Sequence, residues 1–148
     1  MKTLFQLSGL IVFAFVVGAC KTTSSSVKPQ PDNSITEKYW KLIEINGKQV
    51  EATTSREAFI TLKNENQRVN GNGGCNTLNG TYEITPGNRI KFSQMATTMM
   101  ACLNMEIEEG LKKALEMADN YSLSEDGKFL SLNRARMAPL ARFELVLK

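Results

Sequence analysis

The sequence predicts a mainly β (α+β) domain, an antiparallel barrel-like meander of about seven or eight strands with one principal helix. From residue 38 onward, short segments alternate apolar and polar side chains with a period of two, and turn residues separate them. Residues 104–118 instead carry apolar side chains at helical spacing, before the last strands. An antiparallel sheet has to bury one face, and a twisted sheet of this size does so by closing on itself beneath a covering helix.

The expected strands follow one another with short turns between them. The first spans Tyr39 to Ile45 and ends at Asn46-Gly47, a dipeptide typical of two-residue hairpins. Further turns are indicated by Pro86-Gly87-Asn88 and by Asp126-Gly127. The alternation places the other strands near residues 58–62, 68–70, 82–84, 90–92, 121–123, 130–132 and 143–147.

The predicted helix, residues 104–118, has a polar residue at its start and acids in its first turn. Asn104 is suited to cap the helix, and the helix dipole favours the anions Glu106, Glu108 and Glu109. An acid pair or a calcium site is the alternative for these glutamates, but we interpret them as a solvated first turn. Gly110 weakens a helix, which indicates close packing on the sheet.

The chain begins with the features of an export signal. Lys2 is followed by an apolar run over residues 10–17 and then by Val17-Gly18-Ala19-Cys20. A cysteine behind small residues resembles the lipobox of bacterial lipoproteins, in which the signal is cut before the cysteine and the cysteine carries lipid. An ordinary secretory signal is one alternative. An uncleaved membrane helix is another, although the run is shorter than the ~20 residues that a bilayer requires.

This interpretation divides the chain into three parts. Residues 1–19 are the expected lipoprotein signal peptide, and residues 20–36 hold the lipidated Cys20 and a flexible tether rich in Ser and Pro. Residues 37–148 form the expected folded domain. The predicted location is the cell envelope, lipid-anchored and facing the periplasm. An acidic residue directly after the lipidated cysteine is often associated with retention in the inner membrane. This chain has Lys21 at that position, so the outer membrane is favoured.

Composition excludes several classes of function. The chain has no histidine, so it has neither a Ser-His-Asp nucleophile system nor a histidine zinc site. Its formal net charge of +3 is spread along the sequence without a basic run, so no nucleic-acid partner is expected. We predict no catalytic residues, no cofactor and no metal; any catalysis would have to use carboxylates, lysine or tyrosine.

Two cysteines remain besides Cys20. In an oxidising compartment Cys75 and Cys102 are predicted to form a disulfide, which would stabilise the fold by about 3–4 kcal/mol; two buried free thiols are the alternative. Glycines 71, 73 and 74 precede Cys75, and we interpret them as a bulge or tight bend at a sheet corner rather than as an anion cradle.

Methionines gather in the same part of the sequence, at positions 95, 99, 100, 105 and 117. Thioethers together with the Cys102 thiolate would be suited to Cu(I), but methionine is also a common core filler, and the spacing matches no repeated metal motif.

Four segments together resemble the META domain, also called the HslJ-type heat-shock domain. They are Trp40-Lys41-Leu42, the Gly71–Asn76 segment with Gly80-Thr81-Tyr82, the stretch from Ile90 through Thr97–Cys102 into the glutamate-rich helix, and Leu130-Ser131-Leu132. The resemblance covers residues 37–148 and implies a small antiparallel barrel with a helix. It also implies paired cysteines at Cys75 and Cys102, and an envelope role in stress or antibiotic tolerance. It supplies no catalytic residues and no ligand.

The function expected from the sequence is a non-enzymatic binding or stress-tolerance module on the periplasmic side. Its expected contacts are the membrane, through the N-terminal lipid, and an envelope protein. An inhibitor of a protease or lysozyme is the first alternative, and a carboxylate-dependent enzyme acting on envelope components is the second. A clustered pair of carboxylates in a pocket would favour the enzyme, whereas a protruding loop or an exposed apolar patch would favour the inhibitor.

Overall fold

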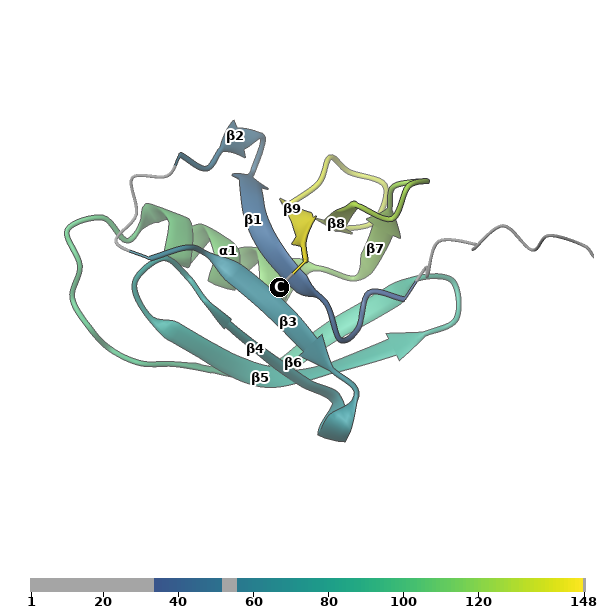
Figure 1. Ribbon diagram of the computed structural model, residues 1–148, viewed down its shortest axis with the longest axis horizontal. Helices are drawn as coiled ribbons and strands as arrows, with labels where there is room; N and C mark the ends of the chain where they lie inside the picture. The colour runs from purple at the N-terminus through teal and green to yellow at the C-terminus, as the bar shows by residue number, and fades with distance from the viewer. Residues whose placement is uncertain (1–33, 52–55, 148) are drawn as a thin grey trace, which may run out of the picture. The chain divides into compact units, whose positions relative to one another are not determined.

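A computed structural model describes residues 34–51 and 56–147, which form an antiparallel sheet and one α-helix (Figure 1). The expected signal peptide, Cys20 and most of the tether lie outside the described residues. Within the described part of the chain, no helix has the length and apolar character needed to cross a membrane.

The strands follow closely the positions expected from the alternation. They are β1 (Tyr39–Ile45), β2 (Lys48–Gln49), β3 (Phe59–Lys63), β4 (Arg68–Asn72), β5 (Thr77–Thr85), β6 (Arg89–Thr97), β7 (Asn120–Leu123), β8 (Phe129–Asn133) and β9 (Ala141–Val146). A short 3-10 helix (Glu65–Gln67) precedes β4. The strand β2 is only two residues long and completes the Asn46-Gly47 hairpin, in which both turn residues have positive φ.

The sheet closes into a ring. Neighbours run in the order β2-β1-β3-β4-β5-β6-β7-β8-β9, and β1 also pairs with β9. The prediction of a mainly β, antiparallel, barrel-like fold is therefore confirmed. One junction is thin, because β6 and β7 share a single residue pair, Arg89 with Asn120.

The helix α1 (Glu106–Met117) lies between β6 and β7 in sequence and packs against β1 and β6. Asn104 stabilises the first turn of the helix, because its Oδ1 accepts a hydrogen bond from the Glu106 N–H at 2.9 Å. A Cβ on Gly110 would stand 2.7 Å from Cγ2 of Ile45 in β1, so the absence of a side chain allows the helix to approach the sheet closely.

The core lies inside the ring and under the helix. Trp40 of β1 is completely buried, and its indole N–H donates to the Ile35 carbonyl at 2.8 Å. Ile35, which composition alone places in the tether, is itself 2% exposed and belongs to this core. The ordered, packed part of the chain therefore includes residues just before β1.

Candidate functional site: the Met loop and its supports

The glycine-rich segment forms a tight turn between β4 and β5. Gly73 N–H donates to the Asn76 carbonyl at 2.9 Å, and Gly74 has a φ of +102°, which favours glycine. Gly74 N–H donates to Oδ1 of Asn72 at 2.8 Å. The interpretation as a bend at a sheet corner agrees with this geometry, and these amides are already engaged by the protein.

An anion does lie at this corner, and it is the carboxylate of Glu108. Its Oε2 accepts from the Asn76 backbone N–H at 2.7 Å and its Oε1 from Asn76 Nδ2 at 3.0 Å. A Cβ on Gly73 would stand 2.6 Å from Cγ of Glu108, so glycine is needed for the two segments to meet.

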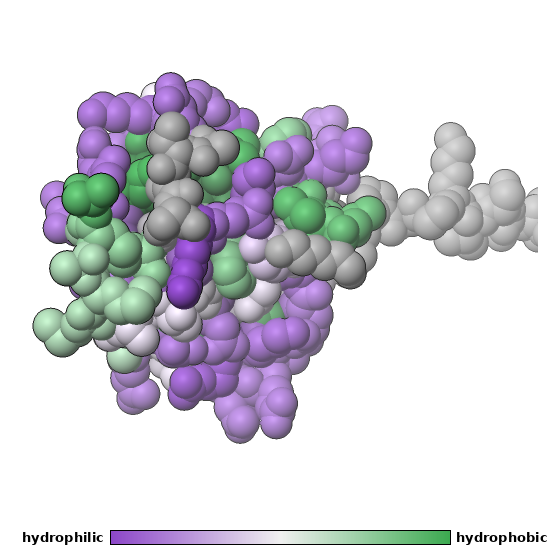
Figure 2. Space-filling model, turned by 60° about the vertical axis from the view of Figure 1, so that its left-hand side comes forward, coloured by the Kyte–Doolittle hydropathy of each residue, from purple (hydrophilic) through white to green (hydrophobic). Residues whose placement is uncertain are grey.

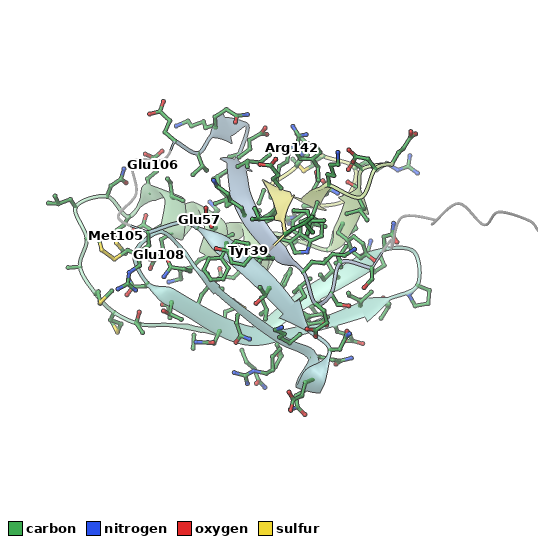
Figure 3. All side chains as sticks on the ribbon, viewed as in Figure 1. Tyr39, Glu57, Met105, Glu106, Glu108 and Arg142 are labelled. Carbon is green, nitrogen blue, oxygen red and sulfur yellow. A yellow bond between two sulfur atoms is a disulfide. The ribbon has the colours of Figure 1, made fainter. Side chains whose placement is uncertain are left out.

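The interpretation of the glutamates as a solvated first turn is wrong for Glu108. Glu108 is 4% exposed, whereas Glu106 and Glu109 are exposed as expected. Figure 3 shows Glu106 and Glu108 leaving the start of α1 on different sides. The physical reason is that Glu108 lies on the helical face of Leu111 and Leu115, which packs inward.

Asn76 connects this corner to the segment that follows β6. Its Oδ1 accepts hydrogen bonds from Thr98 Oγ1 at 2.7 Å and from the Met100 N–H at 2.8 Å. Its Nδ2 also donates to the Met100 carbonyl at 3.0 Å. One buried amide side chain thus binds both main-chain groups of Met100 and the carboxylate of Glu108.

Cys75 and Cys102 form a disulfide, with Cα atoms 6.2 Å apart. Together with Asn76 it attaches the segment joining β6 to α1, residues 98–105, to the β4–β5 corner. We call this segment the Met loop. Its backbone is held near Met100 and again at Cys102, and a segment held at two points has little conformational freedom left to lose on binding.

The Met loop displays large apolar side chains to solvent. Met99 is 98% exposed and Leu103 fully exposed, while Met100 is about half exposed. Figure 2 shows apolar surface gathered on the side of the molecule that carries this loop. The loop lies at the end of the domain opposite to the segment that leads into β1 (Figure 1).

The methionines do not form one cluster. Met95 packs against the core, whereas Met99 and Met100 point to solvent. Cys102 is engaged in the disulfide and supplies no thiolate, so the Cu(I) alternative lacks its strongest donor. Among the described residues no group of His, Cys, Asp and Glu side chains is arranged to hold a metal ion.

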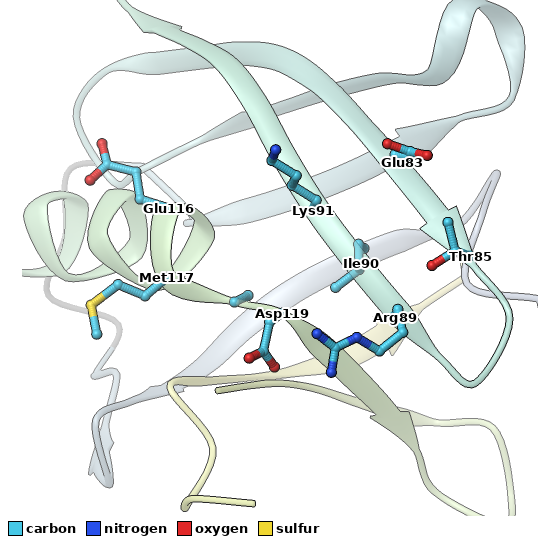
Figure 4. A pocket seen from close by; sticks show the side chains of 9 residues that line it. Glu83, Thr85, Arg89, Ile90, Lys91, Glu116, Met117 and Asp119 are labelled. Carbon is cyan, nitrogen blue, oxygen red and sulfur yellow. The ribbon is translucent and has the colours of Figure 1, made fainter. Parts of the chain in front are cut away.

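A separate pocket of about 420 Å³ lies beside the C-terminal end of α1 and the β5–β6 hairpin. Its charged lining residues are Glu83, Arg89, Lys91, Glu116 and Asp119. In Figure 4 the guanidinium of Arg89 and the carboxylate of Asp119 lie near each other on one side of the pocket. Carboxylates line this pocket, as the enzyme alternative requires. A smaller pocket beside β2 and the start of α1 is also lined by carboxylates, those of Glu51 and Glu106.

The pKa shifts of Asp119 and Tyr39 do not prepare either group for acid–base chemistry at neutral pH. Hydrogen bonds from the Ala135 backbone N–H and from Asn120 lower the pKa of Asp119, and Arg89 and Arg134 act in the same direction. Burial raises the pKa of Tyr39, and its hydrogen bond to Glu57 adds to this effect. Asp119 is therefore ionised and Tyr39 protonated, the ordinary states of both groups at pH 7.

The structure brings together the two predicted cysteines, the glycine turn and part of the methionine group. Sequence reasoning missed Asn76 and Glu108, which hold this arrangement together. A signal for Glu108 was present, because it stands three and seven residues before Leu111 and Leu115, on the apolar face of the helix.

Comparison with known proteins supports the fold and the family. One solved NMR structure is 20% identical, with a TM-score of 0.59 over 75% of this chain and 91% of the other. An NMR structure of a protein from Burkholderia xenovorans is also 20% identical, with a TM-score of 0.58 over 86% of this chain and 97% of the other. No curated protein matches the chain. The sequence pattern that defines the META domain matches residues 33–146, and the chain belongs to the META domain family.

Proposed function

We propose that this protein is a lipid-anchored protein of the bacterial envelope whose META domain is a non-catalytic binding module acting under stress. The observation that carries the proposal is the Met loop, where Met99 and Leu103 are exposed on a backbone held by Asn76 and by a disulfide. Exposed large apolar side chains grouped on one segment are typical of interaction sites. A rigid backbone lowers the entropy that binding costs.

Site-specific photocrosslinking in cells tests the binding surface. A photoreactive amino acid at position 99 is expected to give adducts with an envelope protein under envelope stress. The matched control is position 137, because Met137 is also well exposed but lies between β8 and β9, away from the Met loop. Equal adduct patterns at the two positions, or none at either, would contradict the proposal.

Lipid attachment is tested separately at Cys20. Replacing Cys20 with Ser is expected to abolish labelling with a palmitate analogue and to leave unprocessed precursor, because the thiol is the site of acylation in the lipobox interpretation. Equal labelling of both forms would show that the lipid is elsewhere or absent.

The inhibitor alternative is favoured by the same loop, since a protruding, doubly held segment can enter the cleft of a protease or lysozyme. Its test is a panel of both enzyme classes assayed with the protein and with a Met99→Ser, Leu103→Ser variant. Inhibition that the variant loses would select this alternative.

The enzyme alternative depends on the pocket beside α1. Turnover of peptidoglycan or peptide substrates, lost in a Glu83→Gln, Glu116→Gln variant, would establish it and would overturn the non-catalytic proposal.

A further inference from the structure

The backbone of the Met loop has an inner edge bound to the domain. Thr98 N–H donates to the Thr77 carbonyl at 3.1 Å, which continues the pairing of β5 and β6 beyond Thr97. Met100 then bonds through both its N–H and its carbonyl to Asn76, whose side chain takes the place of a strand partner.

The residues on either side of Met100 have main-chain groups that are not bound to the domain. In an extended chain the main-chain groups of successive residues point to opposite sides, so those of Met99 and Ala101 point away from the domain. Within the described residues, the backbone N–H and carbonyl of Met99 and Ala101 have no hydrogen-bond partner. The Met loop thus offers unpaired main-chain groups just beyond the end of β6.

This edge is short, but it carries neither charged side chains nor proline, two of the features that usually prevent pairing. Folded proteins protect open edges with charged side chains, with proline or by covering them. Residues 92–105 contain no Asp, Glu, Lys, Arg or Pro, and Met99 and Leu103 are exposed. Ala101 is exposed as well, and the chain bends at Leu103, so Met99, Ala101 and Leu103 place apolar side chains in solvent close to the open edge.

We propose that the Met loop binds an extended polypeptide segment of another protein, which adds to residues 99–101 as a strand. The bound segment places apolar side chains against Met99, Ala101 and Leu103, and it carries little charge, as does the loop itself. This inference rests on the proposed binding function and specifies the ligand: unfolded or extended chain rather than a folded surface. Main-chain hydrogen bonds supply affinity that depends little on sequence, and the exposed apolar side chains select uncharged segments.

The test uses the processed, lipidated chain in nanodiscs and a permanently unfolded probe, reduced and carboxymethylated α-lactalbumin carrying a fluorescent label. The anisotropy of the probe is expected to rise on binding. Hydrogen exchange at the Met99 and Ala101 amides is expected to slow about tenfold when the probe saturates the protein, because these amides gain partners. No anisotropy change would overturn the inference, as would binding without protection of these amides.

Variants separate strand addition from simple apolar contact. Ala101→Pro removes an outward N–H and is expected to weaken probe binding about tenfold. Met99→Lys is a second variant that is expected to weaken probe binding, because a lysine on an open edge disfavours strand addition. The Met99 side chain is 98% exposed, so its replacement disturbs no packing. Met137→Lys is the matched control and is expected to bind as the unaltered protein does. If the folded Ala101→Pro variant and the Met99→Lys variant each bind the probe as strongly as the unaltered protein, the inference is overturned.

Other occupants of the edge give different results. Protection of Met99 and Ala101 in nanodiscs without probe would indicate lipid contact, and protection that rises with protein concentration would indicate a second copy of this chain; either would overturn the inference. Adducts at position 99 with a folded envelope protein, without binding of the unfolded probe, would leave the proposed function standing and reject only the extended ligand.

Discussion

Replacing Glu108 with Gln is expected to destabilise the domain more than any other single charge removal in the helix. The carboxylate accepts two hydrogen bonds from Asn76, at 2.7 and 3.0 Å, and is almost fully buried. Glutamine keeps one carbonyl acceptor but directs an NH₂ donor at a donor of Asn76. One hydrogen bond to a charged group is lost, and one buried donor is left without a partner.

The magnitude follows from these two contributions. A hydrogen bond to a charged group contributes about 1.5–3 kcal/mol, and an unsatisfied buried donor costs about 1–3 kcal/mol. Because both refer to the same contact, we expect the free energy of unfolding to fall by about 3 kcal/mol in total. For a domain of this size, such a loss lowers the melting temperature by roughly 10–15 °C.

The assay is urea unfolding followed by circular dichroism, with Glu109→Gln as the control. Glu109 lies in the same helical turn but is exposed, so its replacement tests the helix dipole alone and is expected to cost less than about 1 kcal/mol. A Glu108→Gln variant within 1 kcal/mol of this control would refute the account of the corner as a structure held by a buried carboxylate.

Three further changes test other parts of the structure. Gly73→Ala places a methyl group against the Glu108 side chain and is expected to lower the free energy of unfolding by about 1–3 kcal/mol. In urea unfolding, the double variant with Glu108→Ala should lose less free energy than the sum of the two single variants. Simple additivity would contradict the contact. Replacing Cys75 and Cys102 together with Ser is expected to lower the free energy of unfolding by about 3–4 kcal/mol, measured against the oxidised protein, and an unchanged midpoint would show that the bridge does not constrain the chain. The pKa of Asp119 is lowered in the folded state, so its contribution is present above the unfolded pKa and disappears as the pH falls through the folded value. Unfolding of Asp119→Asn and the unaltered protein at several pH values should therefore differ at neutral pH and converge in acid, and a constant difference would contradict this linkage.

Much of the fold was predictable because it depends on patterns that are local in sequence. The period-two alternation located the strands, and the Asn46-Gly47 hairpin formed as its turn chemistry predicts. The helix was expected over residues 104–118 and spans Glu106–Met117. The ring followed from the need to bury one face of an antiparallel sheet, and β1–β9 pairing closes it.

The candidate site was less predictable because its residues come from separate segments. Asn76 reads in sequence as an ordinary turn residue, and only the approach of β6 gives its side chain the main chain of Met100 to bind. Glu108 has a charged side chain, and its buried position depends on the donors of Asn76, a contact between residues 32 positions apart. The exposure of Met99 was equally hidden, since an apolar residue is by default assigned to the core.

Closure of the ring by its first and last strands also sets the order in which the domain can fold. The strand β1 has β2 and β3 on one edge, but its other edge pairs with β9, whose residues Ala141–Val146 come almost at the end of the chain. A chain that emerges N-terminus first therefore holds that edge of β1 open until about a hundred further residues have arrived, and closing so long a loop is slow. A variant that ends at Leu140 would lose β9, the partner of this edge of β1, and the buried Phe143 together. Completion of the ring thus depends on β9, and a chain without this strand would keep one edge of β1 open.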